Sequence, residues 1–178
     1  MSSRTHHPAR SCLQATLLAA ALTWANSTAA VEREWHVGGA GGAVWLKERQ
    51  LGPGIGLNAG YGLADSLDLT ALVRLSHHSD DPAVTVASSD LALTLKFDVV
   101  RWIPYLQLGA GWHYFAGDEP PLGSGGSKFG VNLGYGVDYL YAREFAIGLA
   151  AEHHLLWADG VQAPIIFPHL RFEYRWGF

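Results

Sequence analysis

The chain has 178 residues, a formal net charge of −4 at pH 7, 49% hydrophobic residues and a single cysteine. Its length fits one domain, and one cysteine excludes an internal disulfide. Its acidic balance, with no basic patch, argues against nucleic acid as a partner. After residue 30 no apolar run reaches the ~18 residues that a spanning helix needs, so residence in a membrane would require strands.

Residues 1–30 have the pattern of a secretory signal peptide. Two arginines precede an apolar run at 13–24 that is too short for a transmembrane helix, and small residues follow up to Ala30. The pattern predicts export and cleavage close to Ala30; an uncleaved anchor is the alternative. Cleavage would remove two of the 12 basic residues and none of the 16 acidic ones, which leaves a charge of about −6. The second expected domain is 31–178.

Eight segments of that second domain alternate apolar residues with small or polar ones. They are 35–46, 55–63, 67–76, 90–98, 106–114, 129–139, 145–154 and 169–178. Period-two alternation predicts strands, and each segment is close to the ~9–11 residues of a tilted transmembrane strand. The predicted fold class is all-β: a closed, antiparallel, eight-stranded up-and-down transmembrane β-barrel, since closure leaves no strand edge unpaired in lipid.

The connections between these segments alternate in length. Short turns are expected at 64–66, 98–102 and 141–143, and longer loops rich in Gly, Pro, Asp and Ser at 48–53, 78–89, 116–127 and 158–164. Short turns on one side, together with both termini, and longer loops on the other are typical of outer-membrane barrels.

The last segment carries an unbroken stripe of apolar side chains on alternate positions: Leu170, Phe172, Tyr174, Trp176 and Phe178. This ending resembles the C-terminal signal of bacterial outer-membrane β-barrels, which the barrel assembly machinery reads. Residues 31–178 as a whole resemble the small eight-stranded barrels of the OmpA/OmpX type, and 96–105 and 135–139 resemble turn regions common in that broad group, which also has porin-like members. The resemblance implies an outer-membrane location and contact with lipid and lipopolysaccharide, but it implies no activity.

With the apolar face in lipid, the charged side chains of the strands face the lumen. Arg74 and Asp90 are expected to pair toward the loop side. Asp68 and Lys96 are expected to do so toward the turn side. Buried charges need partners, and eight strands enclose little more than side chains, so we expect a polar plug and no open pore. The expected network consists of Asp68, Arg74, Asp90, Lys96, Asp138, Glu152, Arg171, Glu173 and Arg175.

Aromatic residues gather near the ends of the segments, as in the two interfacial girdles of a membrane barrel. The expected girdle residues are Trp45, Tyr61, Phe97, Tyr105, Trp112, Tyr114, Tyr139, Phe145, Trp157 and Trp176. The structural alternative is a soluble barrel of the lipocalin kind, with the apolar face inside. Its outer face would then be rich in glycine and poor in lysine, which favours the membrane interpretation.

Histidines are concentrated near the loop-side ends of the third, fifth and seventh segments: His77, His78, His113, His153 and His154. A cluster of them at the rim could bind a transition metal or act as a base. Neighbouring histidines point to opposite faces of a strand, however, and these three segments are not neighbours in the sheet. The sequence therefore predicts no metal site and no cofactor.

His77 and Ser79 have the spacing of a His and a Ser in the lipid A deacylases, which they resemble in this respect alone, because the flanking pattern of that family is missing. No catalytic residue is predicted. The expected function is that of a non-enzymatic, structural or surface-displaying barrel. A narrow channel for ions or small solutes and a lipid A-modifying enzyme are the alternatives. The sequence names no extracellular ligand.

Overall fold

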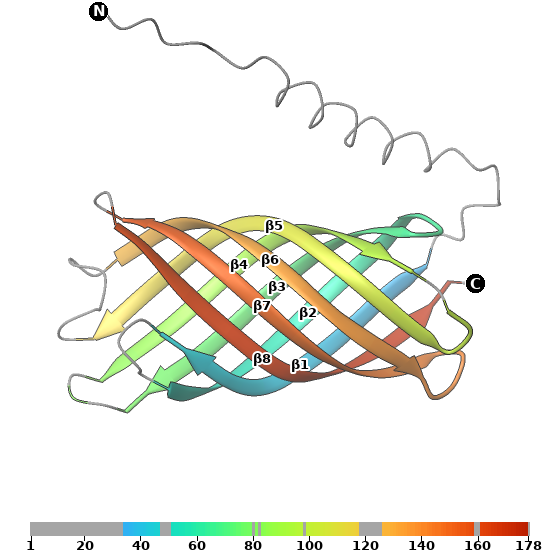
Figure 1. Ribbon diagram of the computed structural model, residues 1–178, viewed down its shortest axis with the longest axis horizontal. Helices are drawn as coiled ribbons and strands as arrows, with labels where there is room; N and C mark the ends of the chain where they lie inside the picture. Colours follow the sequence, from blue (N-terminus) through green and yellow to red (C-terminus); the bar gives the residue numbers. More distant parts are fainter. Residues whose placement is uncertain are drawn as a thin grey trace, which may run out of the picture. The chain divides into compact units, whose positions relative to one another are not determined.

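The computed structural model describes residues 34–46, 51–79, 81, 83–97, 99–117, 126–158 and 161–177. Its strands are β1 (Trp35–Trp45), β2 (Leu51–Ala64), β3 (Leu67–His78), β4 (Val84–Lys96), β5 (Trp102–Gly117), β6 (Gly126–Leu140), β7 (Phe145–Ala158) and β8 (Val161–Trp176). Each pairs antiparallel with the next, and β8 closes on β1 (Figure 1), which confirms the predicted fold class. No helix in the described part of the chain has the length and hydropathy of a membrane span. The predicted signal peptide lies outside the described residues.

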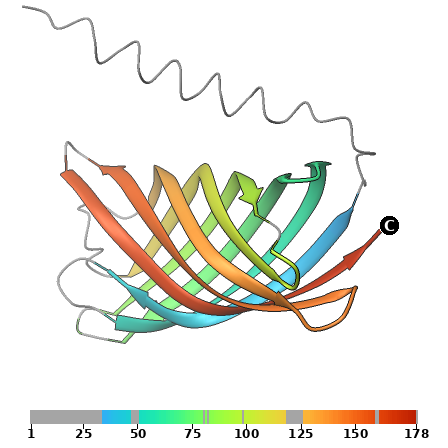
Figure 2. The same ribbon diagram turned by 45° about the vertical axis from the view of Figure 1, so that its right-hand side comes forward.

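The start of β1 and the end of β8 lie at one end of the barrel, together with the described residues of the connections, 65–66, 97, 99–101 and 141–144 (Figures 1 and 2). We call this the turn end and the opposite end the loop end. One turn is tight: the backbones of Val99 and Trp102 exchange two hydrogen bonds of 2.9 and 3.0 Å, and Val100 between them has a φ of 61°. The predicted short turns are therefore at the same end as the start of β1 and the end of β8.

Toward the loop end, β2 to β8 are longer than the sequence predicted, and the eight strands have lengths between 11 and 16 residues. β4 begins at Val84, and only residues 159 and 160 separate β7 from β8. The long loop predicted at 158–164 is wrong. Pro164 was taken as a sign of a loop, but Pro164 and Pro168 both lie inside β8, where Pro164 pairs with Leu155. A proline removes one backbone donor without ending the pairing of its neighbours.

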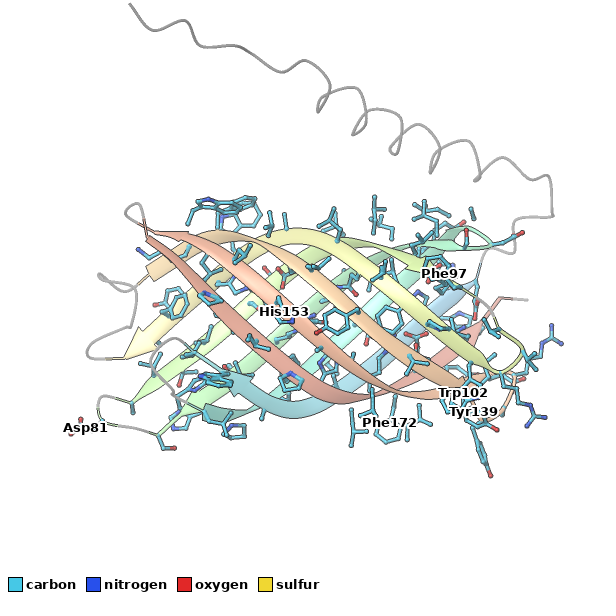
Figure 3. The ribbon with its side chains drawn as sticks, viewed as in Figure 1. Asp81, Phe97, Trp102, Tyr139, His153 and Phe172 are labelled. Carbon is cyan, nitrogen blue, oxygen red and sulfur yellow. The ribbon has the colours of Figure 1, made fainter. Side chains whose placement is uncertain are left out.

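The apolar face of every strand points away from the barrel axis, as the side chains in Figure 3 show. Leu57, Leu108 and Leu149, from three different strands, are 70%, 65% and 62% exposed. Asn132 and Gln107, by contrast, are buried inside. Successive side chains of a strand alternate between faces, so one apolar stripe per strand becomes one continuous apolar outer surface. A soluble barrel with the apolar stripes inside does not describe this arrangement.

Aromatic rings form contacts on the outer surface near both ends. At the turn end, the ring centroids of Trp35 and Tyr61 lie 4.7 Å apart, and those of Trp102 and Tyr139 lie 4.9 Å apart (Figure 3). Toward the loop end, the centroids of Trp112 and Phe129 lie 5.4 Å apart. Of the residues proposed for the girdles, the following lie on the outer face: Trp45, Tyr61, Phe97, Trp112, Tyr114, Tyr139, Phe145, Trp157 and Trp176.

Tyr105 does not belong to this surface, and its assignment to a girdle is wrong. It is buried in the lumen, where its ring lies 4.8 Å from the Cζ atom of Arg171. It shares the inner face with Gln107, two residues further along β5. The prediction used the position of Tyr105 near a strand end and neglected the alternation that fixes its face.

Candidate functional site

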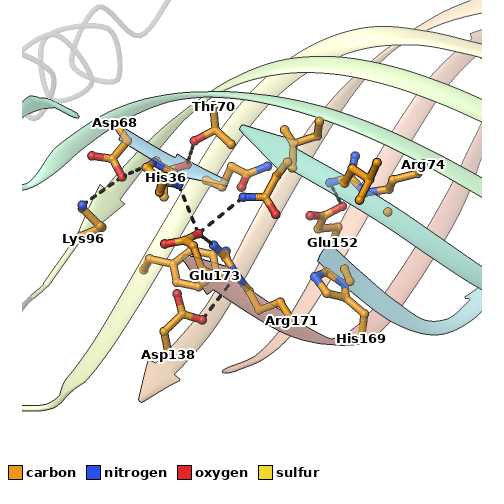
Figure 4. Close-up of a pocket in the computed structure, with 18 of the residues that line it drawn as sticks. His36, Asp68, Thr70, Arg74, Lys96, Asp138, Glu152, His169, Arg171 and Glu173 are labelled. Atoms are coloured by element: carbon orange, nitrogen blue, oxygen red, sulfur yellow. Dashed lines mark hydrogen bonds and ion pairs between the residues drawn. The ribbon is translucent and has the colours of Figure 1, made fainter. Parts of the chain in front are cut away.

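The turn-end half of the lumen is filled by a group of interacting polar side chains, which we call the charged layer: His36, Asn58, Asp68, Lys96, Tyr105, Asp138, Arg171, Glu173 and Arg175. Glu173 lies at its centre, between His36 and Arg171 (Figure 4). Its Oε1 accepts a 3.0 Å hydrogen bond from Nε of Arg175, and its Oε2 lies 3.2 Å from Nδ1 of His36 and pairs with Arg171.

Asp68 links this centre to the other side of the barrel. Its Oδ2 lies 3.1 Å from Nε2 of His36 and 3.0 Å from Nζ of Lys96, the partner expected from the sequence. Gly60 makes room for this arrangement, because a Cβ at that position would collide with the imidazole of His36. The layer therefore joins strands from opposite sides of the lumen through continuous charge-assisted contacts.

Asp138 completes the charged layer on β6. Its Oδ1 lies 3.5 Å from Nε of Arg171, and its Oδ2 lies 3.9 Å from Nη2 of Arg175. The two arginines thus lie among two carboxylates, with Tyr105 packed against Arg171. Tyr105 needs the glycine opposite it on β6, since a Cβ on Gly136 would lie 2.7 Å from Cζ of the tyrosine ring.

A second polar group lies further toward the loop end, and we call it the histidine layer: Arg74, Asp90, His113, Glu152 and His154. Nη1 of Arg74 lies 3.0 Å from Oδ2 of Asp90, the pair expected from the sequence, and its Nη2 pairs with Glu152. Nε2 of His113 lies 3.0 Å from Nδ1 of His154. The inference that histidines on separated strands stay apart is wrong, because inward-facing side chains meet across a narrow lumen.

The other histidines of the expected rim cluster lie elsewhere. His77 and His153 are on the outer side of the wall, where they bond to Thr85 Oγ1 at 3.0 Å and to the Tyr135 hydroxyl at 3.2 Å. His78 is buried, with its Nε2 3.2 Å from Ser76 Oγ. Adjacent histidines point to opposite faces, as the alternation of a strand requires.

Above the histidine layer, the lumen becomes apolar. The side chains there form a buried cluster, which we call the apolar cap: Val44, Leu46, Val84, Val86, Phe115, Leu156, Ile165 and Phe167. The sequence did not predict it, because Val84 and Val86 lay in the loop expected at 78–89, most of the other cap residues lay beyond the expected strand ends, and the whole inner face was expected to be polar. The sequence does carry a signal for it. In β4 the apolar residues change from odd positions, the outer leucines, to even positions, Val84 and Val86, which face the lumen.

Little space remains between these layers. A cavity of about 30 Å³ lies among the charged layer and the residues around Arg74. Another, of about 20 Å³, lies between the histidine layer and the apolar cap. A buried water needs at least ~10–15 Å³ measured in this way, so each cavity has room for one or two waters.

On the outer wall, His77 is exposed near the loop end of β3, and Ser79, just beyond the strand, is exposed as well. Nδ1 of His77 is bonded to Thr85 on β4, its register partner. In a hydrolytic triad, the histidine is oriented by a carboxylate or an equivalent acceptor. Here a threonine hydroxyl occupies that place.

No protein-family model and no curated protein matches the chain, but solved structures do. Neisserial surface protein A is 14% identical, with 82% of this chain and 96% of that protein covered and a TM-score of 0.64. The N-terminal β-barrel domain of OprF from Pseudomonas aeruginosa is 14% identical, with coverages of 82% and 98% and a TM-score of 0.58. The outer membrane enzyme PagL is 18% identical, with coverages of 78% and 98% and a TM-score of 0.53. The chain therefore has the fold of the small eight-stranded outer-membrane β-barrels.

Proposed function

We propose that this chain is an outer-membrane protein with a sealed lumen and a non-enzymatic, structural or surface-displaying role. The observation that carries this proposal is the stacking of the charged layer, the histidine layer and the apolar cap inside one barrel. An aqueous channel needs a continuous polar path, and the apolar cap interrupts such a path at the loop end. The barrel wall is then a scaffold for whatever the loop end displays.

The proposed location follows from the outer surface and the last strand. The surface is apolar between two groups of aromatic rings, as contact with lipid and lipopolysaccharide requires. Four residues of the expected assembly signal face outward on β8 and are therefore presentable to an assembly partner: Leu170, Phe172, Tyr174 and Trp176. Phe178 lies outside the described residues. Export by a cleaved signal peptide and reading by the barrel assembly machinery are part of this proposal.

If the lumen is sealed, the protein should not conduct ions across a bilayer. Purified protein reconstituted in planar bilayers is expected to give no unitary conductance steps in KCl, because the apolar cap and the charged layer both close the lumen. A general porin serves as the positive control for fusion, and retention of the fast-migrating, unboiled form on gels shows that the barrels are folded. Steps that scale with salt and change in size on Glu152→Gln would support the channel alternative and overturn the proposal.

The enzyme alternative has one specific observation in its favour, the exposed residues His77 and Ser79 on a fold that PagL uses as an enzyme. We expect lipopolysaccharide incubated with the purified barrel to keep an unchanged lipid A mass, because Thr85, and no carboxylate among the described residues, bonds to His77. A loss of an acyl chain by the wild type that disappears in Ser79→Ala would establish a hydrolase. Ser89→Ala, on the outer face of β4, is the matched control.

A further inference from the structure

We propose that Asp90, His113 and His154 form a binding site for one divalent transition-metal ion of the zinc class inside the lumen. The three side chains come from β4, β5 and β7 and are 5%, 2% and 2% exposed. One ligand atom from each lies within 4.8 Å of the other two. Two imidazoles and a carboxylate are a donor set that suits Zn²⁺ and its first-row neighbours.

The spacing of the ligand atoms fits one ion. Nε2 of His113 and Nδ1 of His154 lie 3.0 Å apart, and Oδ1 of Asp90 lies 4.0 Å from the same Nδ1. Tetrahedral Zn²⁺ with bonds of ~2.0–2.1 Å separates its ligand atoms by about 3.3 Å. A hydrogen bond between the two facing imidazole nitrogens needs one proton between them, and a metal ion bound there would take the place of that proton.

Neighbouring side chains orient two of these ligands toward a common point. Of the two oxygens of Asp90, Oδ2 accepts a hydrogen bond from Arg74, and Oδ1 has no hydrogen-bond partner among the residues that the structure describes. Oε2 of Glu152 lies 3.5 Å from Nε2 of His154, on the side of the ring away from His113. A carboxylate behind a histidine places the proton on that nitrogen and leaves the other free to coordinate.

Charge and space favour a cation at the same point. The histidine layer has one guanidinium against the two carboxylates of Asp90 and Glu152, so it has one uncompensated negative charge when the histidines are neutral. The cavity of about 20 Å³ beside His113 and His154 has room for a water as fourth ligand. Because the apolar cap covers this cavity, a bound ion would exchange slowly and would cross-link three strands across the lumen.

The test is metal retention after folding. The untagged full chain is refolded from urea into detergent with ZnCl₂ and desalted, and zinc is counted by mass spectrometry. We expect about one Zn²⁺ per chain in the wild type and at least a tenfold lower content in His113→Gln and His154→Gln. His77→Gln removes an outward-facing histidine and is expected to retain the metal. Wild type without retained zinc, or equal retention in all four proteins, overturns the proposal.

A second readout covers variants that fold poorly. Glu152→Gln leaves all three ligands in place and is expected to weaken zinc affinity ~10–100-fold, as loss of an outer-shell carboxylate does. Refolding with zinc is also expected to raise the urea midpoint of the wild type relative to refolding with EDTA, and to leave that of His154→Gln unchanged. Wild-type zinc affinity in Glu152→Gln, or a zinc-dependent rise in midpoint of the same size in His154→Gln, would contradict a site built from these residues.

Discussion

Replacing Glu173 with alanine is expected to lower the free energy of unfolding of the barrel by about 3–5 kcal/mol, the cost of removing one partner of a buried ion pair. Glu173 is buried and contacts His36, Arg171 and Arg175 through its two oxygens. Its removal leaves two guanidinium groups with Asp138 as the remaining carboxylate in contact with both among the described residues. The lumen has room for very few waters, so the uncompensated positive charge would be poorly solvated and would destabilise the folded state.

The measurement is urea-induced unfolding in detergent micelles, followed by tryptophan fluorescence and by the mobility shift on unboiled gels. Asp65→Asn is the matched control, because it also removes one carboxylate charge but lies exposed in the turn between β2 and β3. Glu173→Gln keeps the shape and loses the charge, and we expect it to lie between the wild type and Glu173→Ala. A loss below about 1 kcal/mol in Glu173→Ala, similar to that of an exposed pair, would mean that the arginines are hydrated and the lumen is open to water.

The fold and two of the ion pairs follow from the sequence because they depend on local geometry. Period-two alternation fixes the face of each residue, and both pairs were expected because their members lie at similar depth on consecutive strands. Arg74 lies opposite Ser88 and Asp68 opposite Thr94, so Asp90 and Lys96 are each two residues further along the partner strand. Side chains at such diagonal positions on one face are within reach of each other when they are long.

The cross-lumen contacts depend on properties that the sequence does not express locally. His113 and His154 lie on β5 and β7, and their meeting depends on the tilt and stagger with which the whole barrel closes. The apolar cap is a different case: its residues keep the inward phase of their strands, but Val84 and Val86 were assigned to a loop and most of the others lay beyond the predicted strand ends. Strand ends are the least reliable part of a prediction made from alternation.

The location of the outer surface in lipid is tested most directly by a charge at mid-depth. Leu108 lies in the middle of β5, faces outward between Leu93 and Leu133 and is 65% exposed. Leu108→Lys is expected to destabilise the barrel in phospholipid vesicles by ~2–4 kcal/mol, the cost of a lysine at the bilayer midplane. Leu51→Lys is the matched control, because Leu51 is 63% exposed but lies at the loop end of β2.

Leu51→Lys is expected to lower the free energy of unfolding by only ~0–1 kcal/mol, because an ammonium group at the loop end of β2 reaches the membrane interface. The contrast between the two sites isolates depth, since side chain, exposure and charge change are the same. Equal and small losses at both positions would mean that the leucines of the outer face lie in water. That result would contradict contact between the apolar outer surface and lipid. The protein would then be a water-soluble barrel with a sealed lumen.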